Sequence, residues 1–467
     1  MSAAPYSYIQ RQIHDNTPFR LGRNEMKLDD ISLEGKYLRL SEVVEDVALP
    51  KTADAQYPGS HCAFRTVAGI LPLIKNSYGL LLGPAICLYN AKLTVNIRSL
   101  TSDPRPNNLL FLTYSQDDII FGFHKKVREA ILEVDRKYHP EVLFLVTTCL
   151  QEIVGEDFDA SVEEIQRMVK ARLLVIHTDN FTCEDAAPGI ENVFLSLSEL
   201  MEPQETVEGS INLLGFWTSK AKTTELARLL GSEGIKIKNA IPSYCSPEDL
   251  SRAPGVSLNI ALDHFALKLA KKMKEMFGTE YIYCERPYHP DSIELWYQKI
   301  ADALGIDLDL KVADLKRETE ELISQAKGSF SGKSCALFGQ PGRTLDMAFL
   351  LSELGIELKA IMLHRLLSDD YRDAQKLLAE GIDPLVFRGD NALQTEKLLS
   401  TLRPDICIGC RDYGVLARQG IEPCMLIPSH FKLGFEATNE ILNLMRQEPA
   451  GFWALRYKEQ LLNNGAV

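Results

Sequence analysis

The chain has 467 residues and a formal net charge of −13, from 51 Lys and Arg against 64 Asp and Glu. Its hydrophobic fraction of 45% and charged fraction of 25% are ordinary for a soluble globular protein, and its length suggests two to four domains. The acidic balance argues against a nucleic-acid binder and against attachment to an anionic membrane surface.

The amino terminus gives no sign of export. Residues 1–6 contain no basic segment followed by an apolar run, and no apolar stretch of the chain reaches about 18 residues. We therefore expect a cytoplasmic protein. In that reducing compartment the ten cysteines are thiols or metal ligands rather than disulfides.

Residues 1–55 are polar and irregular, and we interpret them as an N-terminal arm that could wrap a partner, with a plain surface extension as the alternative. Three cysteines follow: Cys62, Cys87 and Cys149, each beside a glycine or at the end of an apolar strand. Their spacing is too sparse for a zinc knuckle and suits a large inorganic cluster held by three separate loops. Three buried structural cysteines are the alternative.

Strands and helices alternate through this region. Strands are expected at 108–113, 141–146 and 173–178, with helices at 117–136 and 161–169. Such alternation predicts a parallel sheet, and ligands gather beyond the carboxyl ends of its strands. Cys149 and the turn His177-Thr178-Asp179-Asn180 both lie at such ends.

The same alternation occurs twice more. After a polar linker at 202–209, strands are expected at 211–216, 236–238, 256–261 and 281–283, with helices at 222–230, 265–276 and 290–304. A charged connector helix at 311–327 leads to strands at 334–338, 359–363, 384–387 and 406–409, with helices at 344–354, 369–378, 394–402 and 434–445. The sequence therefore predicts one α/β architecture used three times.

Several weaker motifs keep two interpretations. Cys407-Ile408-Gly409-Cys410 has the Cys-x-x-Cys form of redox and metal sites, but no second pair is nearby and we favour a core role. The pair Asp263 and His264 could deliver protons, or Asp263 could simply cap a helix. His289 could line a substrate pocket, although a surface loop is the preferred interpretation.

The turn Gly339-Gln340-Pro341-Gly342-Arg343 follows a strand and begins a helix, which makes it an anion site in principle. It lacks a GxGxxG or Walker pattern, so we expect no bound nucleotide. The other cysteines are interpreted as core or loop thiols: Cys183, Cys245, Cys284, Cys335 and Cys424.

Taken together, the motifs resemble one family, the component 1 proteins of nitrogenase and nitrogenase-like reductases, from about residue 55 to residue 450. The similarity rests on the Cys62 and Cys87 pair and on these motifs: Thr147-Thr148-Cys149-x-x-Glu152-Ile153-x-Gly155-x-Asp157, and Arg252-Ala253-Pro254 before Leu258-Asn259. Three further motifs are similar to the beta side of the family: Gly339-Gln340-Pro341, Leu351-x-Glu353-Leu354-Gly355 and Pro404-Asp405-x-x-Ile408-Gly409.

The resemblance implies an α/β fold with three Rossmann-like domains and parallel sheets around an interface metal-cluster site. We expect these domains at 56–205, at 206–327 and at 328–467, the last with a C-terminal helix. The resemblance also implies an iron–sulfur cluster, of the [8Fe-7S] P-cluster type or [4Fe-4S], shared with a partner subunit and held by Cys62, Cys87 and Cys149. The implied partners are a homologous alpha-type subunit in an α2β2 heterotetramer and an ATP-dependent iron protein, a reductase homodimer. No catalytic residue is assigned to this chain.

Two positions depart from the family pattern. The beta subunit of molybdenum nitrogenase places a serine oxygen near its cluster after a His-Thr-Pro pattern, whereas this chain has Asp179 and Asn180, either of which could offer oxygen instead. The cysteine that holds the large cofactor of the alpha subunit is replaced by Asp263. Cys424 or His430 could supply a ligand near the carboxyl end, but the surrounding pattern does not match.

These residues predict a beta-like electron-relay subunit of a nitrogenase-like oxidoreductase that lacks the large cofactor. A cofactor subunit with rearranged ligands is the alternative. The substrate could be a carbon–sulfur bond, as in methylthio-alkane reductase. Two other functions stay open: a scaffold subunit for nitrogenase cofactor assembly, and a subunit of a tetrapyrrole-reducing complex.

Overall fold

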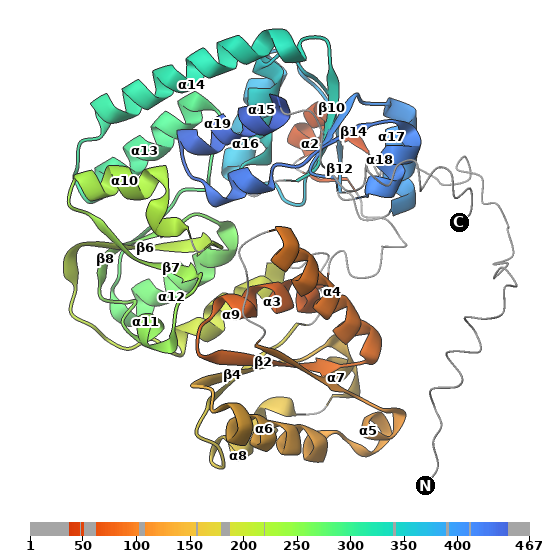
Figure 1. Ribbon diagram of the computed structural model, residues 1–467, viewed down its shortest axis with the longest axis vertical. Helices are drawn as coiled ribbons and strands as arrows, with labels where there is room; N and C mark the ends of the chain where they lie inside the picture. Colours follow the sequence, from red (N-terminus) through yellow and green to blue (C-terminus); the bar gives the residue numbers. More distant parts are fainter. Residues whose placement is uncertain are drawn as a thin grey trace, which may run out of the picture. The chain divides into compact units, whose positions relative to one another are not determined.

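The computed structural model describes residues 37–46, 48–50, 62–101, 108–155, 157–178, 187–218, 220–339, 342–388, 392–410 and 412–446. All of them fall in one unit of the chain, Gly35–Val467. The described residues form three sheets of parallel strands, with a single antiparallel strand at the edge of the largest, and helices pack on the sheet faces (Figure 1). The α/β class with parallel sheets that the sequence predicts is therefore confirmed.

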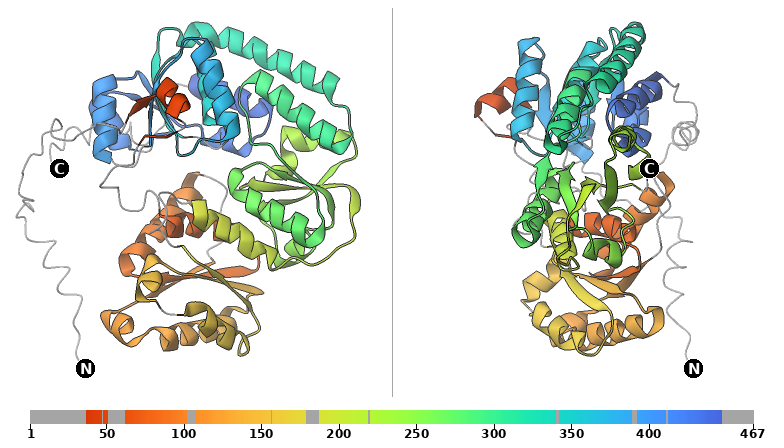
Figure 2. Two further views of the ribbon diagram at one scale, coloured as in Figure 1. Left: turned by 180° about the vertical axis from the view of Figure 1, so that it is seen from behind. Right: turned by 90° about the vertical axis from the view of Figure 1, so that its left-hand side faces the viewer.

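The first sheet has four parallel strands in the order β3-β2-β4-β5. Their bounds are β2 Ser77–Gly83, β3 Leu109–Thr113, β4 Val142–Val146 and β5 Arg172–Ile176. Helices α3 (Ala63–Ile70), α4 (Ala85–Thr101) and α9 (Ala187–Ser198) lie on one side of the strands, and α6 (His124–Tyr138) and α8 (Phe158–Gln166) on the other (Figures 1 and 2).

Burial on both faces explains why β4 has no polar residue. Val142, Phe144 and Val146 belong to the apolar cluster under α3 and α9, while Leu143 and Leu145 belong to the cluster under α6 and α8. Successive side chains of a strand point to opposite faces, so a strand covered on both sides is apolar throughout.

The second sheet has the order β7-β6-β8-β9, again parallel. Its strands are β6 Val207–Phe216, β7 Lys236–Pro242, β8 Val256–Ala261 and β9 Tyr281–Tyr283. Residues of α12 (Leu267–Phe277) join the same apolar cluster as α9, so the first and second sheets share part of a core. On the other face α10 (Glu225–Ser232) and α13 (Pro290–Leu304) form a separate cluster.

The third sheet has the order β1-β12-β11-β10-β13-β14. Its strands are β1 Leu38–Arg39, β10 Ser334–Leu337, β11 Glu357–Met362, β12 Leu385–Phe387, β13 Ile406–Ile408 and β14 Glu422–Cys424. One apolar cluster lies under α2 (Leu40–Asp46), α14 (Asp309–Phe330), α15 (Thr344–Glu353), α16 (Ser368–Ala379) and α19 (Phe435–Arg446). The other lies under α17 (Ala392–Leu402) and α18 (Tyr413–Gln419).

Strand order defines one switch point in each sheet, where the chain finishes one side of the sheet and begins the other. These points lie between β2 and β4, between β6 and β8, and between β10 and β13. In parallel α/β sheets, ligands bind outside the carboxyl ends of the strands at such points. The candidate ligand-binding residues are therefore those that follow β4, β8 and β13.

The structure corrects the sequence expectations in two places. The single helix expected at 117–136 is two helices, α5 (Gln116–Phe121) and α6, because Gly122 has φ 89° and interrupts the helical path. Residues 38–46, which the sequence analysis places in the N-terminal arm, form β1 and α2 instead. There β1 pairs with β12, and Leu40 and Val43 are fully buried in the core of the third sheet.

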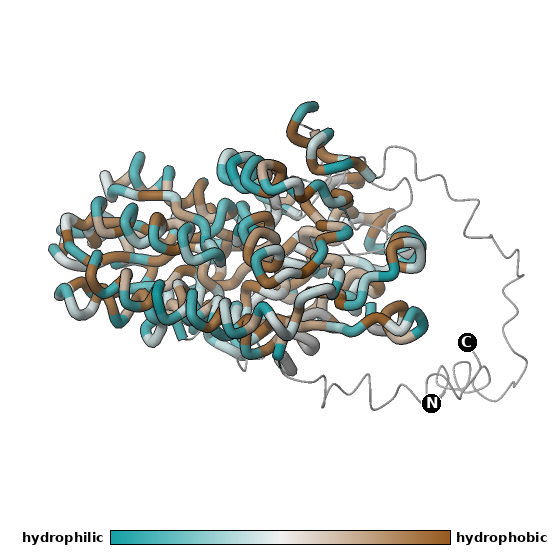
Figure 3. The backbone as a smooth tube through the Cα atoms, turned by 90° about the horizontal axis from the view of Figure 1, so that it is seen from above, coloured by the Kyte–Doolittle hydropathy of each residue, from teal (hydrophilic) through white to brown (hydrophobic). Residues whose placement is uncertain are grey.

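The helices alternate between hydrophilic and hydrophobic residues along their length (Figure 3), as expected for helices with one face against a sheet. Among the described residues, no helix is long and apolar enough to cross a membrane.

Candidate functional site

The three cysteines that the sequence predicts as cluster ligands all lie where helices of the first sheet begin. Cys62 immediately precedes α3, Cys87 lies in the first turn of α4 after β2, and Cys149 is the first residue of α7 (Cys149–Val154) after β4. Since β2 and β4 border the switch point of this sheet, topology alone brings Cys87 and Cys149 to the same edge.

The three thiols also interact electrostatically. Burial raises the pKa of Cys87 to about 11, with smaller contributions from the neighbouring thiols of Cys149 and Cys62. All three cysteines are half-buried, and none of them forms a disulfide. Segments far apart in the sequence thus bring three thiols together at one end of one sheet.

This arrangement suits a cluster better than a single ion. In the part of the chain that the structure describes, no group of three or more His, Cys, Asp or Glu side chains is placed to hold one metal ion. A multi-iron cluster is larger than one ion and binds thiolates that lie farther apart. The donor set, three thiols, is also the one that iron–sulfur clusters use. The residues present therefore fit such a group.

A buried hydrogen-bond network fixes the turn that carries Cys149. Thr148 donates from its backbone N–H and its hydroxyl to Gln151 Oε1, at 2.9 and 2.8 Å. Gln151 Nε2 in turn donates to the hydroxyl of Tyr114, at 2.8 Å. A Cβ on Gly83 would lie 2.6 Å from Thr148 Cγ2, so glycine is needed there for the ends of β2 and β4 to approach each other. Sequence reasoning missed Gln151 and Tyr114.

The two helices that begin at cysteines expose apolar side chains. On α4, Ile86 is 65% exposed and Tyr89 is 63% exposed; on α7, Ile153 is 66% exposed. Leu93, one helical turn beyond Tyr89, is also exposed. We call these four residues the α4–α7 surface. On α4 the spacing of Ile86, Tyr89 and Leu93 puts them on one face of the helix, and exposed apolar residues grouped in this way are typical of a protein contact.

The turn expected to supply an oxygen ligand is only partly described. Asp179 and Asn180 lie outside the described residues. His177, at the end of β5, has its Nε2 atom 3.0 Å from Asp159 Oδ2. Thr178 donates from its hydroxyl to Thr147 O, at 2.6 Å, which ties this turn to the one before Cys149.

The switch point of the second sheet holds Asp263, directly after β8. Asp263 Oδ1 accepts from the backbone N–H of Phe265 at 3.1 Å and lies 3.0 Å from His264 Nδ1. Burial opposes its ionisation, but the hydrogen bond and charge of His264, with the charge of Arg365, lower the pKa of Asp263 overall. Asp263 thus caps a helical turn, which was one of the two interpretations from the sequence, and it also contacts His264. Proton delivery by this pair stays a prediction.

A second buried carboxylate lies in the same electrostatic group. Glu285 is 3% exposed, forms an ion pair with Arg365 and accepts from the hydroxyl of Tyr283 at 3.1 Å. Burial raises the pKa of Glu285, which Arg365 partly offsets and Asp263 reinforces. The side chains of this group interact with one another, and none of them carries a sulfur atom. The site does not fit a metal–sulfur cofactor held by a thiolate at position 263.

Most of the other candidate residues named from the sequence take part in packing, hydrogen bonds or ion pairs within the fold. Cys424 lies in β14 and packs against the core of the third sheet. His430 lies in a short 3-10 helix, Ile427–Phe431, and its backbone O accepts from Arg286 Nη1 at 3.1 Å. Gln340 and Pro341 lie outside the described residues. Arg343, at the end of that turn, forms a buried ion pair with Asp373, which gives it a structural partner.

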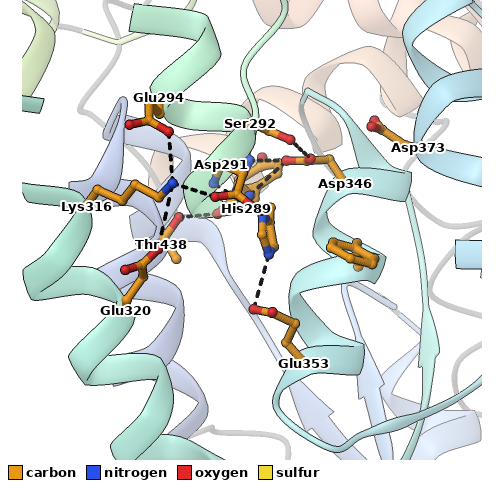
Figure 4. A network of polar contacts seen from close by, with 12 residues as sticks. His289, Asp291, Ser292, Glu294, Lys316, Glu320, Asp346, Glu353, Asp373 and Thr438 are labelled. Atoms are coloured by element: carbon orange, nitrogen blue, oxygen red, sulfur yellow. Dashed lines mark hydrogen bonds and ion pairs between the residues drawn. The ribbon is translucent and has the colours of Figure 1, made fainter. Parts of the chain in front are cut away.

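The surface position expected for His289 is wrong. His289 is 4% exposed, its Nδ1 atom accepts from the backbone N–H of Asp291, and its Nε2 atom lies 3.1 Å from Glu353 (Figure 4). It precedes α13, so its ring joins the start of that helix to α15. No local pattern could indicate this contact, because Glu353 lies 64 residues further along the chain.

Comparison with known proteins shows which family the chain is similar to. The model of the family described as nitrogenase component 1 type oxidoreductase matches residues 62–437. A nitrogenase iron-molybdenum cofactor biosynthesis protein, NifE, of Nostoc sp. (strain PCC 7120) is 26% identical over 362 residues, which cover 74% of this chain and 73% of that protein. A nitrogenase molybdenum-iron protein alpha chain of Methanothermobacter marburgensis is 24% identical over 430 residues, covering 84% and 87%.

A solved structure shares the fold. The structure titled "Nitrogenase Cp1 at pH 6.5" superposes with a TM-score of 0.67 and 16% sequence identity, and the match covers 92% of this chain and 95% of that one. At this identity the match supports the fold alone.

Proposed function

The chain belongs to the nitrogenase component 1 type oxidoreductase family, and we propose that it acts as one subunit of a nitrogenase-like assembly that holds an iron–sulfur cluster between its subunits. Cys62, Cys87 and Cys149 are the proposed ligands. The observation that carries the proposal is their convergence at the switch point of the first sheet, where the thiols of Cys149 and Cys62 add to the effect of burial in raising the pKa of Cys87.

The ligand set supports a group shared between chains. Three thiolates make a partial shell, and the exposed α4–α7 surface lies on the two helices that carry Cys87 and Cys149. The proposed partner is a homologous alpha-type subunit, which would supply the other ligands and cover this surface. Burying apolar area beside the ligands would couple cluster retention to subunit association.

When bound, such a cluster stores and passes electrons at low potential. This chain's own residues have three tasks in the proposal. The three thiols lose their protons to become ligands. The network of Thr148, Gln151 and Tyr114 orients the loop of Cys149. The glycine turn at Gly83 brings the two strand ends together.

The site of substrate reduction is proposed to lie in the partner. Asp263 stands where the family's alpha subunit has its cofactor cysteine, and its carboxylate is engaged by His264 and a backbone N–H. We propose a relay role: electrons arrive from an ATP-dependent iron protein and leave toward the partner's cofactor. A carbon–sulfur bond is the proposed target.

A second function has support of its own. The relatives reported above include NifE, named as a cofactor biosynthesis protein, and an alpha chain. A role as an assembly scaffold is therefore a full alternative to the reductase role, and the beta-type assignment stays a prediction. Both roles use the same three cysteines and the same paired architecture.

Co-purification with the homologous partner chain separates the two functions. The purified pair is mixed with a reduced iron protein, MgATP and a thioether substrate, and product is measured over many turnovers. A reductase forms product in an ATP-dependent reaction. A scaffold forms none, but transfers a metal–sulfur cofactor to a cofactor-free enzyme that is then activated. Absence of product together with cofactor transfer would contradict the reductase role.

A further inference from the structure

Two cysteines lie at the switch point of the third sheet. Cys407 lies in β13, and Cys410 follows two residues after the strand. Between them Gly409 has φ 81°, a conformation that favours glycine, and its backbone N–H donates to Cys424 O at 3.0 Å. The turn that separates the two cysteines is thus fixed by the backbone and ties β13 to β14.

The two thiols lie against each other in one apolar environment. Cys407 and Cys410 are both almost fully buried and belong to one cluster with Phe338, Leu399 and Val415. Their thiols are hydrogen-bonded to each other. An i to i+3 separation across a turn is also compatible with the short Cα distance that a disulfide needs.

The thiols are chemically unequal. Burial raises the pKa of Cys407, and its hydrogen bond to Cys410 raises it further. The pKa of Cys410 is lowered, first by the hydrogen bond from Cys407 and then by one from the backbone N–H of Asp412, against the opposing effect of burial. Such asymmetry is typical of dithiols in which one sulfur attacks and the other resolves.

Two further cysteines lie on adjacent strands but face away. Cys335 pairs in register with Ile406, and Cys424 pairs with Ile408, whereas Cys407 pairs with Ala336. Because side chains alternate along a strand, Cys335 and Cys424 point to the face opposite to Cys407. They belong with the other apolar cluster, so Cys407 and Cys410 are the two cysteines that share one cluster.

We propose that Cys407 and Cys410 are a reversible oxidation site, at which a small peroxide converts the two thiols into one intramolecular disulfide. The thiolate of Cys410 attacks a peroxide oxygen, the O–O bond breaks and a sulfenic acid forms with release of water or an alcohol. The Cys407 sulfur then attacks the Cys410 sulfur, the S–O bond breaks and water leaves. Two thiols and hydrogen peroxide give one disulfide and two water molecules.

The disulfide would form next to the start of helix α18. Asp412, two residues after Cys410, caps α18 by accepting from the backbone N–H of Val415 at 3.1 Å. Closing the disulfide joins the end of β13 to this cap. The site needs neither the cluster cysteines nor a partner chain, so it stands independently of the proposed function.

The test uses the full chain, purified under reductant and exposed to one or two equivalents of hydrogen peroxide. Free thiols are then blocked with N-ethylmaleimide, and tryptic peptides are weighed. Cys407 and Cys410 lie in one peptide that ends at Arg411. We expect this peptide to lose two hydrogens and escape labelling, and dithiothreitol to restore both labels. Full labelling of both cysteines after oxidation overturns the proposal.

Variants add an independent check. With Cys407→Ser, Cys410 should accumulate as a sulfenic acid that dimedone traps, because the resolving sulfur is gone. Cys335→Ser is the matched control, because that residue is buried in the same sheet but faces away, and the disulfide should form as in the unchanged chain. If the unchanged chain instead carries Cys410 to a sulfinic acid without a disulfide, the two thiols do not resolve each other and the proposal fails.

Discussion

Cys87 shows how the proposed ligands constrain their own chemistry. Burial and two neighbouring thiols raise its pKa to about 11, so without metal it is a thiol at neutral pH. Iron binds the thiolate, and binding must therefore displace protons from the site. The convergence that makes the three cysteines a ligand set also disfavours three free negative charges in one place.

The first prediction concerns the alkylation of Cys87 in metal-free protein. Below a pH of about 11 the folded protein keeps this sulfur protonated, so its rate of reaction with iodoacetamide should keep rising with pH until about 11. An ordinary thiol levels off near its own pKa of about 8.5. Mass spectrometry of the Cys87 peptide gives the rate at each pH. The same measurement in urea is the control, and an unchanged profile on unfolding contradicts the proposed environment.

Local patterns in the sequence predict some residues of the site and not others. Cys87 could be identified because it follows a glycine turn, and Cys149 because it lies at the end of an apolar strand. Gln151 could not, because its partner Tyr114 lies 37 residues away and no local pattern links them. The same holds for Arg365, whose ion pair with Glu285 joins residues 80 positions apart.

At the scale of single elements, the start of α13 rests on a buried carboxylate from α15. Asp346 is 1% exposed and accepts from the backbone N–H of Tyr288 at 2.6 Å, from that of His289 at 2.8 Å and from the hydroxyl of Ser292 (Figure 4). A carboxylate at a helix start satisfies amides that have no partner within the helix. Asp346 thus attaches α13, which packs on the second sheet, to α15, which packs on the third.

The second prediction follows from this attachment. Asp346→Ala leaves two buried backbone N–H groups and a hydroxyl without an acceptor, so the free energy of unfolding should fall by on the order of 3 kcal/mol. Urea denaturation followed by circular dichroism measures the loss. Asp302→Ala is the matched control on α13, since Asp302 is exposed, and it should change stability by less than about 0.5 kcal/mol. Equal midpoints for the two variants contradict the anchoring role.

A long periodic pattern of apolar residues predicts helices and strands well. It does not show where a single glycine interrupts one of them. The helices at 290–304 and 344–354 were expected almost where α13 and α15 lie. The expected helix at 117–136 kept its apolar spacing across Gly122, so the break could not be seen from periodicity. The strand β2 was not expected because glycines interrupt it. A Cβ on Gly79 would lie 2.7 Å from Leu109 Cδ2, so packing against β3 favours glycine there.

At the scale of the whole chain, each sheet places a different chemistry at its switch point. The first has the three cysteines proposed as cluster ligands, the second the ion pairs of Asp263, and the third the dithiol of Cys407 and Cys410. Alternation in the sequence predicts three such units, whereas strand order, and with it the meeting of Cys87 and Cys149, requires the fold. We propose domain limits at 56–205, 206–327 and 328–467, with β1 added to the third sheet.

The proposed assembly also makes a prediction at this scale. Changing Ile86 and Tyr89 to Ser removes exposed apolar area from the α4–α7 surface, so association with the partner chain should weaken about tenfold or more. Analytical ultracentrifugation of the pair measures it. Leu310, which is exposed on α14 away from the cysteine helices, gives the control Leu310→Ser. An equal effect of both changes contradicts the surface assigned.

The most direct measurement is the iron content and EPR spectrum of the anaerobically purified assembly. We expect a variant with Cys62, Cys87 and Cys149 changed to Ala to lose its iron and its cluster signal while keeping its circular dichroism spectrum. A matched variant with Cys284, Cys335 and Cys424 changed to Ala, all outside the site, should retain both. If the variant without Cys62, Cys87 and Cys149 keeps the iron of the unchanged protein, these cysteines do not hold a cluster and the central claim is wrong.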